Sequence, residues 1–215
     1  MNRDLEPNAV KPIAEAHGSA TPVIKSVSLP LTLFFAVLAA LIRLIPFGVR
    51  PPNFAANGAL SLFGGAKLPL YLILPIQFAV LACSDIILYM VYGWRPFNLA
   101  VYIGFALYAI MGRYLLRGKD SVLRIVGATW LGSLTFFLLT NFAAWVQLSP
   151  LGSGPVLYEA SFRGLIECYT KGLVFLLYTM AGDFGCTAVM FGAEAWLRAR
   201  VEQTTEATIG SEVRS

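Results

Sequence analysis

The sequence has 215 residues, of which 57% are hydrophobic and 13% are charged, with a formal net charge of +4. Soluble domains usually carry roughly a quarter charged residues, so this composition and the mean hydropathy of +0.69 exclude an ordinary soluble protein. The composition instead predicts an all-α integral membrane protein.

Three regions follow one another along the chain. Residues 1–28 are polar and lack the short basic start and brief apolar core of a cleaved signal, so we expect a disordered cytoplasmic tail. Residues 29–197 carry the hydrophobic runs and are expected to form the transmembrane domain. Residues 198–215 are expected to form a disordered cytoplasmic C-terminal tail.

Five hydrophobic runs reach or approach the length of about 20 residues that a helix needs to cross a bilayer. They are residues 29–47, 68–92, 97–116, 122–148 and 173–197. Residues 54–66 lie between the first two runs and are too few to span without tilt or bilayer thinning. They form either a short sixth helix or a re-entrant segment.

The basic residues indicate how many helices cross the membrane, because Lys and Arg of short loops stay on the cytoplasmic side. The most basic loop, "RYLLRGKDSVLR" at 113–124, is cytoplasmic if the chain crosses six times and external if it crosses five times. We therefore expect a polytopic bundle of six transmembrane helices with a short second helix, in the bacterial inner membrane and with both termini cytoplasmic. This topology accounts for the net charge, which is then little evidence for a nucleic-acid partner.

Polar side chains occur within the predicted helices or at their ends, mostly in the outer half of the bundle. They are Arg43, Asn53, Asn57, Asp85, Asn141 and Asp183. Polar groups inside a membrane are costly and usually have a partner or a function. In one interpretation Arg43 pairs with Asp85 or Asp183, and the asparagines cap helix ends. In the interpretation that we adopt, the six residues line a substrate-binding pocket that opens to the outer side.

The segment "RPPNFAANGALSLFGGA" at 50–66 connects the first helix to the short one and would form the rim of that pocket. Pro51 and Pro52 end the first helix, and Asn53 is placed to cap the second. The glycines of the short helix allow its backbone to approach neighbouring helices closely. A short helix with small residues suits the wall of a cavity.

A second feature of the outer side is the amphipathic stretch at 158–171, which precedes the last hydrophobic run. Its charged residues recur every four positions, as in Glu167 and Lys171, which favours pairing along one helix face. We expect an interfacial helix lying on the bilayer surface, with a lid over the pocket as the alternative.

The first hydrophobic run also contains Ala36 and Ala40, a spacing of small residues that permits close contact between membrane helices. This pair is a candidate interface for a partner protein. Arg43 lies seven residues after Ala36 and therefore on nearly the same face of the helix.

Several stretches together carry a family resemblance. They are "RLIPFGVRPPNFAANGALSLFGGA" at 43–66, Asp85, "FALYAIMGRYL" at 105–115, "GSLTFFLLTNFAAWV" at 132–146 and "GDFGCTAVMFGAEA" at 182–195. Over residues 29–197 the chain resembles an uncharacterised family of small bacterial membrane proteins that are regarded as transport proteins. The resemblance implies a membrane transport function.

The expected architecture also resembles that of the substrate-binding S subunits of energy-coupling-factor vitamin transporters. The shared features are the six-helix plan, the short second helix, the outer pocket and the alanine pair. That resemblance implies a transmembrane coupling subunit and two ATPases supplied by other chains.

Catalytic motifs are missing from the sequence. It contains no H-E-x-x-H, no G-x-S-x-G and no G-x-x-x-x-G-K-[ST], so we expect neither an enzyme nor a bound metal or cofactor. An aspartyl mechanism would require Asp85 and Asp183 to lie within a few ångströms of each other. We expect a transporter subunit that captures a small solute or micronutrient from the outer side. The alternatives are a structural or assembly protein and an intramembrane enzyme.

Overall fold

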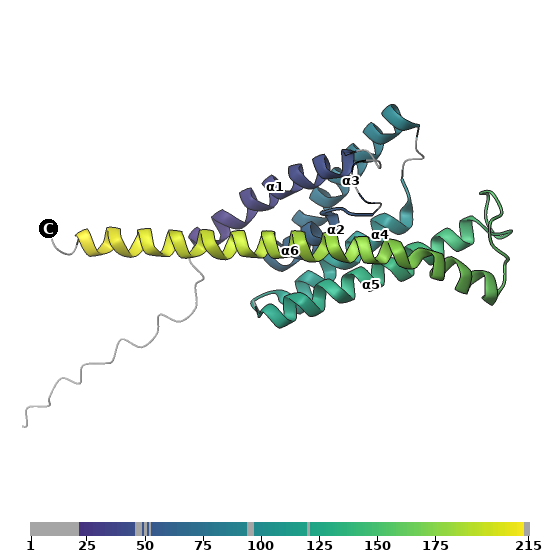
Figure 1. Ribbon diagram of the computed structural model, residues 1–215. Helices are drawn as coiled ribbons and strands as arrows, with labels where there is room; N and C mark the ends of the chain where they lie inside the picture. Colours follow the sequence, from purple (N-terminus) through teal and green to yellow (C-terminus); the bar gives the residue numbers. More distant parts are fainter. Residues whose placement is uncertain are drawn as a thin grey trace, which may run out of the picture.

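The computed structural model describes residues 22–45, 49, 51, 53–93, 97–119 and 121–212, and the regular structure in these residues is entirely helical. The order along the chain is α1 (Pro22–Leu44), α2 (Asn57–Lys67), α3 (Leu70–Tyr92), α4 (Leu99–Met111), the π-helical turn η1 (Gly112–Leu116), α5 (Val122–Gln147) and α6 (Phe162–Glu212) (Figure 1). The predicted all-α fold is confirmed.

Four of these helices are long and apolar enough to cross a membrane. They are α3, α4 together with η1, α5, and the part of α6 over Phe162–Thr204. The first predicted crossing is present as α1, whose apolar part, Ser28–Leu44, is shorter than these four. Residues 54–66 contain the short helix α2. The structure therefore supports a membrane protein, and the count of six crossings stays a prediction.

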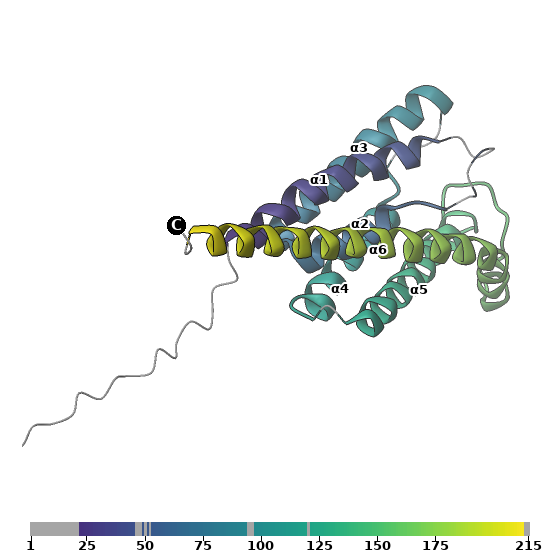
Figure 2. The same ribbon diagram turned by 60° about the vertical axis from the view of Figure 1, so that its left-hand side comes forward.

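Helix α2 lies in the interior of the bundle. Every residue from Asn57 to Ala66 is buried, and α2 contacts all of the other helices. In Figures 1 and 2, α1 and α3 lie on one side of it, and α4 and α5 lie on the other. Enclosure by protein explains how an element too short to span a bilayer can lie at membrane depth, because its end groups do not face lipid.

Glycines allow the close approach of α2 to the π-helical end of α4. A Cβ atom at Gly65 would overlap the carbonyl of Ala109, and one at Gly112 would overlap the carbonyl of Leu62. Both neighbours are backbone atoms, which cannot rotate away as a side chain can. The close packing predicted for the glycines of the short helix is thus present.

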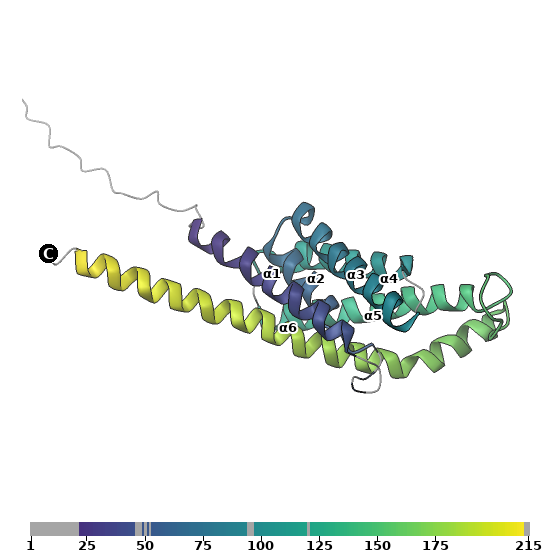
Figure 3. The same cartoon turned by 90° about the horizontal axis from the view of Figure 1, so that it is seen from above.

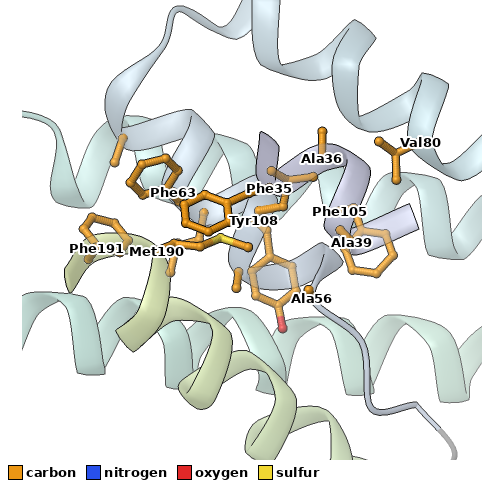
Figure 4. Packing of buried hydrophobic residues seen from close by; sticks show 14 of the residues in the cluster. Phe35, Ala36, Ala39, Ala56, Phe63, Val80, Phe105, Tyr108, Met190 and Phe191 are labelled. Carbon is orange, nitrogen blue, oxygen red and sulfur yellow. The ribbon is translucent and has the colours of Figure 1, made fainter. Parts of the chain in front are cut away.

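The apolar core is built around aromatic side chains from α1, α2 and α6 (Figure 4). Phe63 of α2 packs edge-to-face against Phe35 of α1, with ring centroids 5.9 Å apart, and against Phe191 of α6, at 5.1 Å. Such edge-to-face pairs stabilise a core beyond their buried area. The short helix is therefore anchored to the first and the last helix of the bundle.

Helix α6 differs from the prediction in length. Residues 158–171 were expected to form a separate interfacial helix, but α6 begins at Phe162 and continues through Gly172 without a break (Figure 3). Its first turns pack on α5, where the Tyr169 hydroxyl donates to the Leu138 carbonyl at 2.7 Å. The prediction of a separate interfacial helix is therefore wrong. At its other end α6 reaches Glu212, through most of the segment 198–215 that was expected to be disordered.

Candidate functional site

The helix ends define two ends of the bundle. At the basic end, α2 finishes with Lys67, η1 leads into the basic loop, and α5 begins at Val122. At the far end, α1 and α3 finish and α4 begins. The predicted site residues lie at the far end and in the middle of the bundle.

Arg43 and Asp85 form an ion pair at the far end. The guanidinium Nη2 lies 2.6 Å from Asp85 Oδ1, and the side chains are 19% and 9% exposed. Arg43 also donates to the hydroxyl of Ser84 and, at 3.3 Å, to the carbonyl of Leu81. Of the two carboxylates considered for Arg43, the structure selects Asp85.

Asp85 has further partners in α4 and just before it. Its Oδ2 accepts a hydrogen bond from the Tyr102 hydroxyl at 3.0 Å and one from the backbone N–H of Phe97 at 3.3 Å. The pair thus links the end of α1, the last turns of α3 and the start of α4. Buried ionic groups are tolerated only with such additional hydrogen bonds, so this geometry favours the structural interpretation of Arg43 and Asp85.

Asp183 lies against the first turn of α2. It is 2% exposed, and its carboxylate accepts hydrogen bonds from the hydroxyls of Tyr108 and Ser133, the latter at 2.7 Å. It also bonds the backbone N–H of Ala59. A side chain at Gly58 would overlap the carboxylate, so the glycine is what permits this approach. The sequence prediction did not anticipate that Asp183 binds α2.

The contact explains how α2 begins without a capping side chain of its own. Its N-cap residue is Ala56, which offers no side-chain hydrogen bond. The first turn of a helix has unsatisfied N–H groups and a partial positive charge, which a carboxylate complements. Asp183 supplies that carboxylate from α6. The capping role predicted for Asn53 is wrong, because this exposed residue lies in the preceding turn with a φ of 60°.

Asn57 is the predicted residue with the most unusual environment. It is fully buried, and neither its amide nitrogen nor its amide oxygen has a hydrogen-bond partner among the described residues. The same is true of the Ser61 hydroxyl, one turn further along α2, and of the Gln77 amide on α3. Buried polar groups are almost always hydrogen-bonded, so three such side chains call for an explanation.

Register places Ser61 and Gln77 near one another. Gly64 of α2 packs on Ile73 of α3, and α3 begins only three residues after the end of α2. One turn from that contact, α2 presents Ser61 and α3 presents Gln77, at about the same level of the bundle. Gln77 was not among the predicted site residues, although an amide in the middle of the apolar run 68–92 was a visible signal.

Asn141 lies apart from these residues. Its amide donates to the carbonyl of Phe137 on its own helix at 2.9 Å, and its oxygen packs against Gly172 of α6. The structure therefore does not bring the six predicted residues into one cluster. Asp85 accepts a hydrogen bond from Tyr102, and Asp183 accepts one from Tyr108. These two tyrosines are about 9 Å apart along α4, so the two carboxylates occupy separate sites. Within the described ranges, no group of His, Cys, Asp and Glu could hold a metal ion.

Ala36 and Ala40 face the interior of this chain. Ala36 is buried in the core cluster, and the partly buried Ala40 packs against it. The opposite side of α1 exposes large apolar residues such as Phe34 and Val37. In this conformation the alanine pair contacts other helices of the same chain, and its role as a partner interface stays a prediction.

The apolar helices and the buried polar interior define a helical membrane protein. The chain belongs to a family of unknown function, DUF6580, whose model matches residues 25–205. This membership agrees with the resemblance to an uncharacterised membrane family. No curated protein and no solved structure matches the chain.

Proposed function

We propose that this protein is a membrane transport protein that binds a small polar solute in the middle of its helix bundle. The observation that carries the proposal is the set of fully buried polar side chains without partners, Asn57, Ser61 and Gln77. An amide or hydroxyl buried without a hydrogen bond costs roughly 1–3 kcal/mol on protein scales. A bound solute with donors and acceptors of its own would satisfy these groups.

The neighbouring geometry supports the same location. Asn57 is adjacent in sequence to Gly58, against which the carboxylate of Asp183 packs. A solute held by Asn57 would therefore lie at the positive end of α2 and close to a buried acid. This combination of amide, hydroxyl and carboxyl groups suits a small polar molecule, such as a micronutrient, better than a purely apolar one.

We further propose that the solute enters from the far end, opposite the basic loops, and that the protein works with an energising module. The proposed module is a transmembrane coupling subunit with ATPases, as in transporters with S subunits. Binding through Ala36 and Ala40 would require α1 to move away from the core. The exposed apolar side of α1 offers a surface that requires no such movement.

A ligand screen on the purified full chain tests the binding step. Thermal unfolding in detergent is measured with a library of small polar metabolites and vitamins, and a solute that binds raises the unfolding temperature. Asn57→Ala and Gln77→Met should each abolish this increase while leaving the ligand-free protein as stable as the wild type or more so. Removal of an unsatisfied buried group has no hydrogen bond to lose, which explains the retained stability.

Thr140→Val is the matched control, because the Thr140 hydroxyl bonds only the carbonyl of Phe136 on its own helix in the described structure. This variant should keep the ligand response. If no compound shifts unfolding and the two site variants are simply more stable, the structural or assembly alternative is favoured. Conversion of a bound compound, detected by mass spectrometry, would favour the enzyme alternative.

A further inference from the structure

Asp183 is a buried acid that no cation of the described residues accompanies. Its partners are the hydroxyls of Tyr108 and Ser133 and the backbone N–H of Ala59. The titratable groups near it are Tyr108 from α4 and Cys186 on α6 itself, and neither supplies a positive charge. Ionisable residues inside membrane helices often carry protons in pumps and transporters.

The Ser133 hydroxyl lies within hydrogen-bond distance of two acceptors. Its oxygen is 2.7 Å from Asp183 Oδ2 and 3.1 Å from the carbonyl oxygen of Thr129. A hydroxyl has one proton to donate and also accepts hydrogen bonds. If Asp183 is ionised, Ser133 donates to its carboxylate. If Asp183 is protonated, its O–H can donate to Ser133, and Ser133 can donate to Thr129. The cluster therefore offers hydrogen bonds to both protonation states of Asp183.

A cavity of about 430 Å³ leads from the basic end toward this cluster. Val122 on its rim is 76% exposed, and the small residue Gly192 leaves room between α5 and α6. Thr129 and Thr187 line the end of the cavity that lies closest to Asp183. Thr187 follows Asp183 by four residues, or one turn of α6. The cavity thus ends one helical turn from the buried acid.

Three polar atoms on the cavity wall have no hydrogen-bond partner within the described ranges, the Thr187 hydroxyl, Glu194 Oε1 and Arg198 Nε. Glu194 and Arg198 form an ion pair that does not satisfy these two atoms. Thr187 is 2% exposed, and its hydroxyl lacks the bond to the preceding turn that the Thr179 hydroxyl makes. A donor, an acceptor and a hydroxyl are satisfied together by water, which both donates and accepts.

These three residues share one face of α6 with Asp183. Positions 183, 187, 194 and 198 lie within about 60° of one another around the helix and extend over about 22 Å along its axis. Exposure decreases inward, from 29% for the Arg198 side chain to 3% for Glu194 and 2% for Asp183. A stripe of polar side chains therefore leads from the surface to the buried acid.

We propose that Asp183 binds a proton that reaches it from the basic end through water in this cavity. A protonated water beside Thr187 delivers its proton to Asp183 Oδ2 and is left as neutral water. The carboxylate becomes a neutral acid, and its new O–H donates to Ser133 Oγ. Ser133 keeps its own proton and turns it to the carbonyl of Thr129.

Proton binding would weaken the hold of Asp183 on α2. The ionised carboxylate complements the positive end of α2 and accepts from the Ala59 N–H, whereas a neutral acid binds this end less strongly. Asn57 lies at the same end of α2, so proton and solute would affect each other's binding. This coupling rests on the proposed function, whereas the proton site itself does not.

Infrared spectroscopy of the full chain in liposomes tests the proton site. Acidification should add the C=O band of one buried protonated carboxyl group, and Asp183→Asn should lose this band. Glu202→Gln is the matched control, an exposed acid on the same helix, and should keep it. Ser133→Ala removes the acceptor of the new O–H and should shift the band. An unchanged band in folded Asp183→Asn, or an unshifted band in Ser133→Ala, would show that the proton binds elsewhere.

Cysteine labelling tests the route. In inside-out membrane vesicles of a variant without the three native cysteines, Thr187→Cys should react with a small water-soluble methanethiosulfonate, because only a hydrated thiol ionises and reacts. Thr179→Cys, one turn from Asp183 on the other side, should not react. Adding Gly192→Leu should fill the cavity and abolish labelling of Thr187→Cys, whereas Gly185→Leu, also in open space, should not. An unreactive Thr187→Cys would show that water does not reach Asp183 by this cavity.

The coupling is tested with any compound that the ligand screen identifies. Its affinity for the wild type should change with pH, and its affinity for Asp183→Asn should not. Equal pH dependence of the two proteins would refute the coupling. If the screen identifies no compound, the infrared and labelling results still decide the proton site, so the failure of either proposal can be recognised separately.

Discussion

The ion pair between Arg43 and Asp85 allows the structural interpretation to be tested by free energies. In Arg43→Met the Asp85 carboxylate loses its cation but keeps the donors Tyr102 and Phe97. Breaking a buried pair costs about 3–5 kcal/mol, and we expect the lower end because two hydrogen bonds remain. The double variant Arg43→Met with Asp85→Leu removes both charges. It should be more stable than either single variant by at least about 1 kcal/mol.

The double variant should not recover fully, because it leaves the Tyr102 hydroxyl and the Phe97 N–H without their acceptor. An unsatisfied buried group costs about 1–3 kcal/mol. Adding Tyr102→Phe removes one of these groups and should recover about 1 kcal/mol more. This graded order of stability follows from the contacts of Asp85 and would not arise from a general loss of packing.

The assay is reversible unfolding in mixed detergent and SDS micelles, followed by circular dichroism. Arg117→Met is the matched control, since Arg117 is exposed in the turn after η1. Additive destabilisation by the two single substitutions would refute the reasoning, because it would show that the two side chains do not interact energetically. Folded variants that have lost only solute binding would instead place the pair in the transport site.

Three other predictions concern the centre of the bundle and its orientation. Gly65→Ala should destabilise by about 1–3 kcal/mol in the same unfolding assay, because its methyl group would overlap backbone, whereas Gly127→Ala meets open space and should be neutral. Tyr108→Phe removes a donor to the buried carboxylate of α6 and should cost about 1–3 kcal/mol. With the three native cysteines replaced, cysteine at Lys119 should be shielded from an impermeant thiol reagent in intact cells, and cysteine at Ser153 should react. The reverse labelling would overturn the topology.

Hydrophobic length predicted most helices correctly because it depends on local composition. Residues 97–116 and 122–148, for example, agree with α4 plus η1 and with α5 to within about two residues. One exception was the start of α6, because residues 158–171, just before the glycine at 172, were expected to form a separate interfacial helix. In the fold this glycine packs against Asn141 of α5, and an interior glycine costs only about 1 kcal/mol.

The candidate site was predictable only in part. The sequence showed that Arg43 needed a carboxylate, yet the choice between Asp85 and Asp183 depends on which helices are neighbours. The failure of Asn53 as a cap has a similar cause, since the cap of α2 comes from Asp183, far away in sequence. Helix lengths can be read from composition, but polar partners are set by packing.

Both ends of α2 are held by carboxylates of α6. Asp183 contacts the first turn of α2, and Glu194 pairs with Lys67 at its last residue. The two acids are about 16 Å apart along α6, which matches the length of α2. An acid at the start of a helix and a lysine at its end both complement the helix dipole, so this clamp stabilises an element too short to be stable alone. Asn57 and Lys67 are thus opposite ends of one short helix, so a shift of α2 on solute binding would change its ion pair with Glu194.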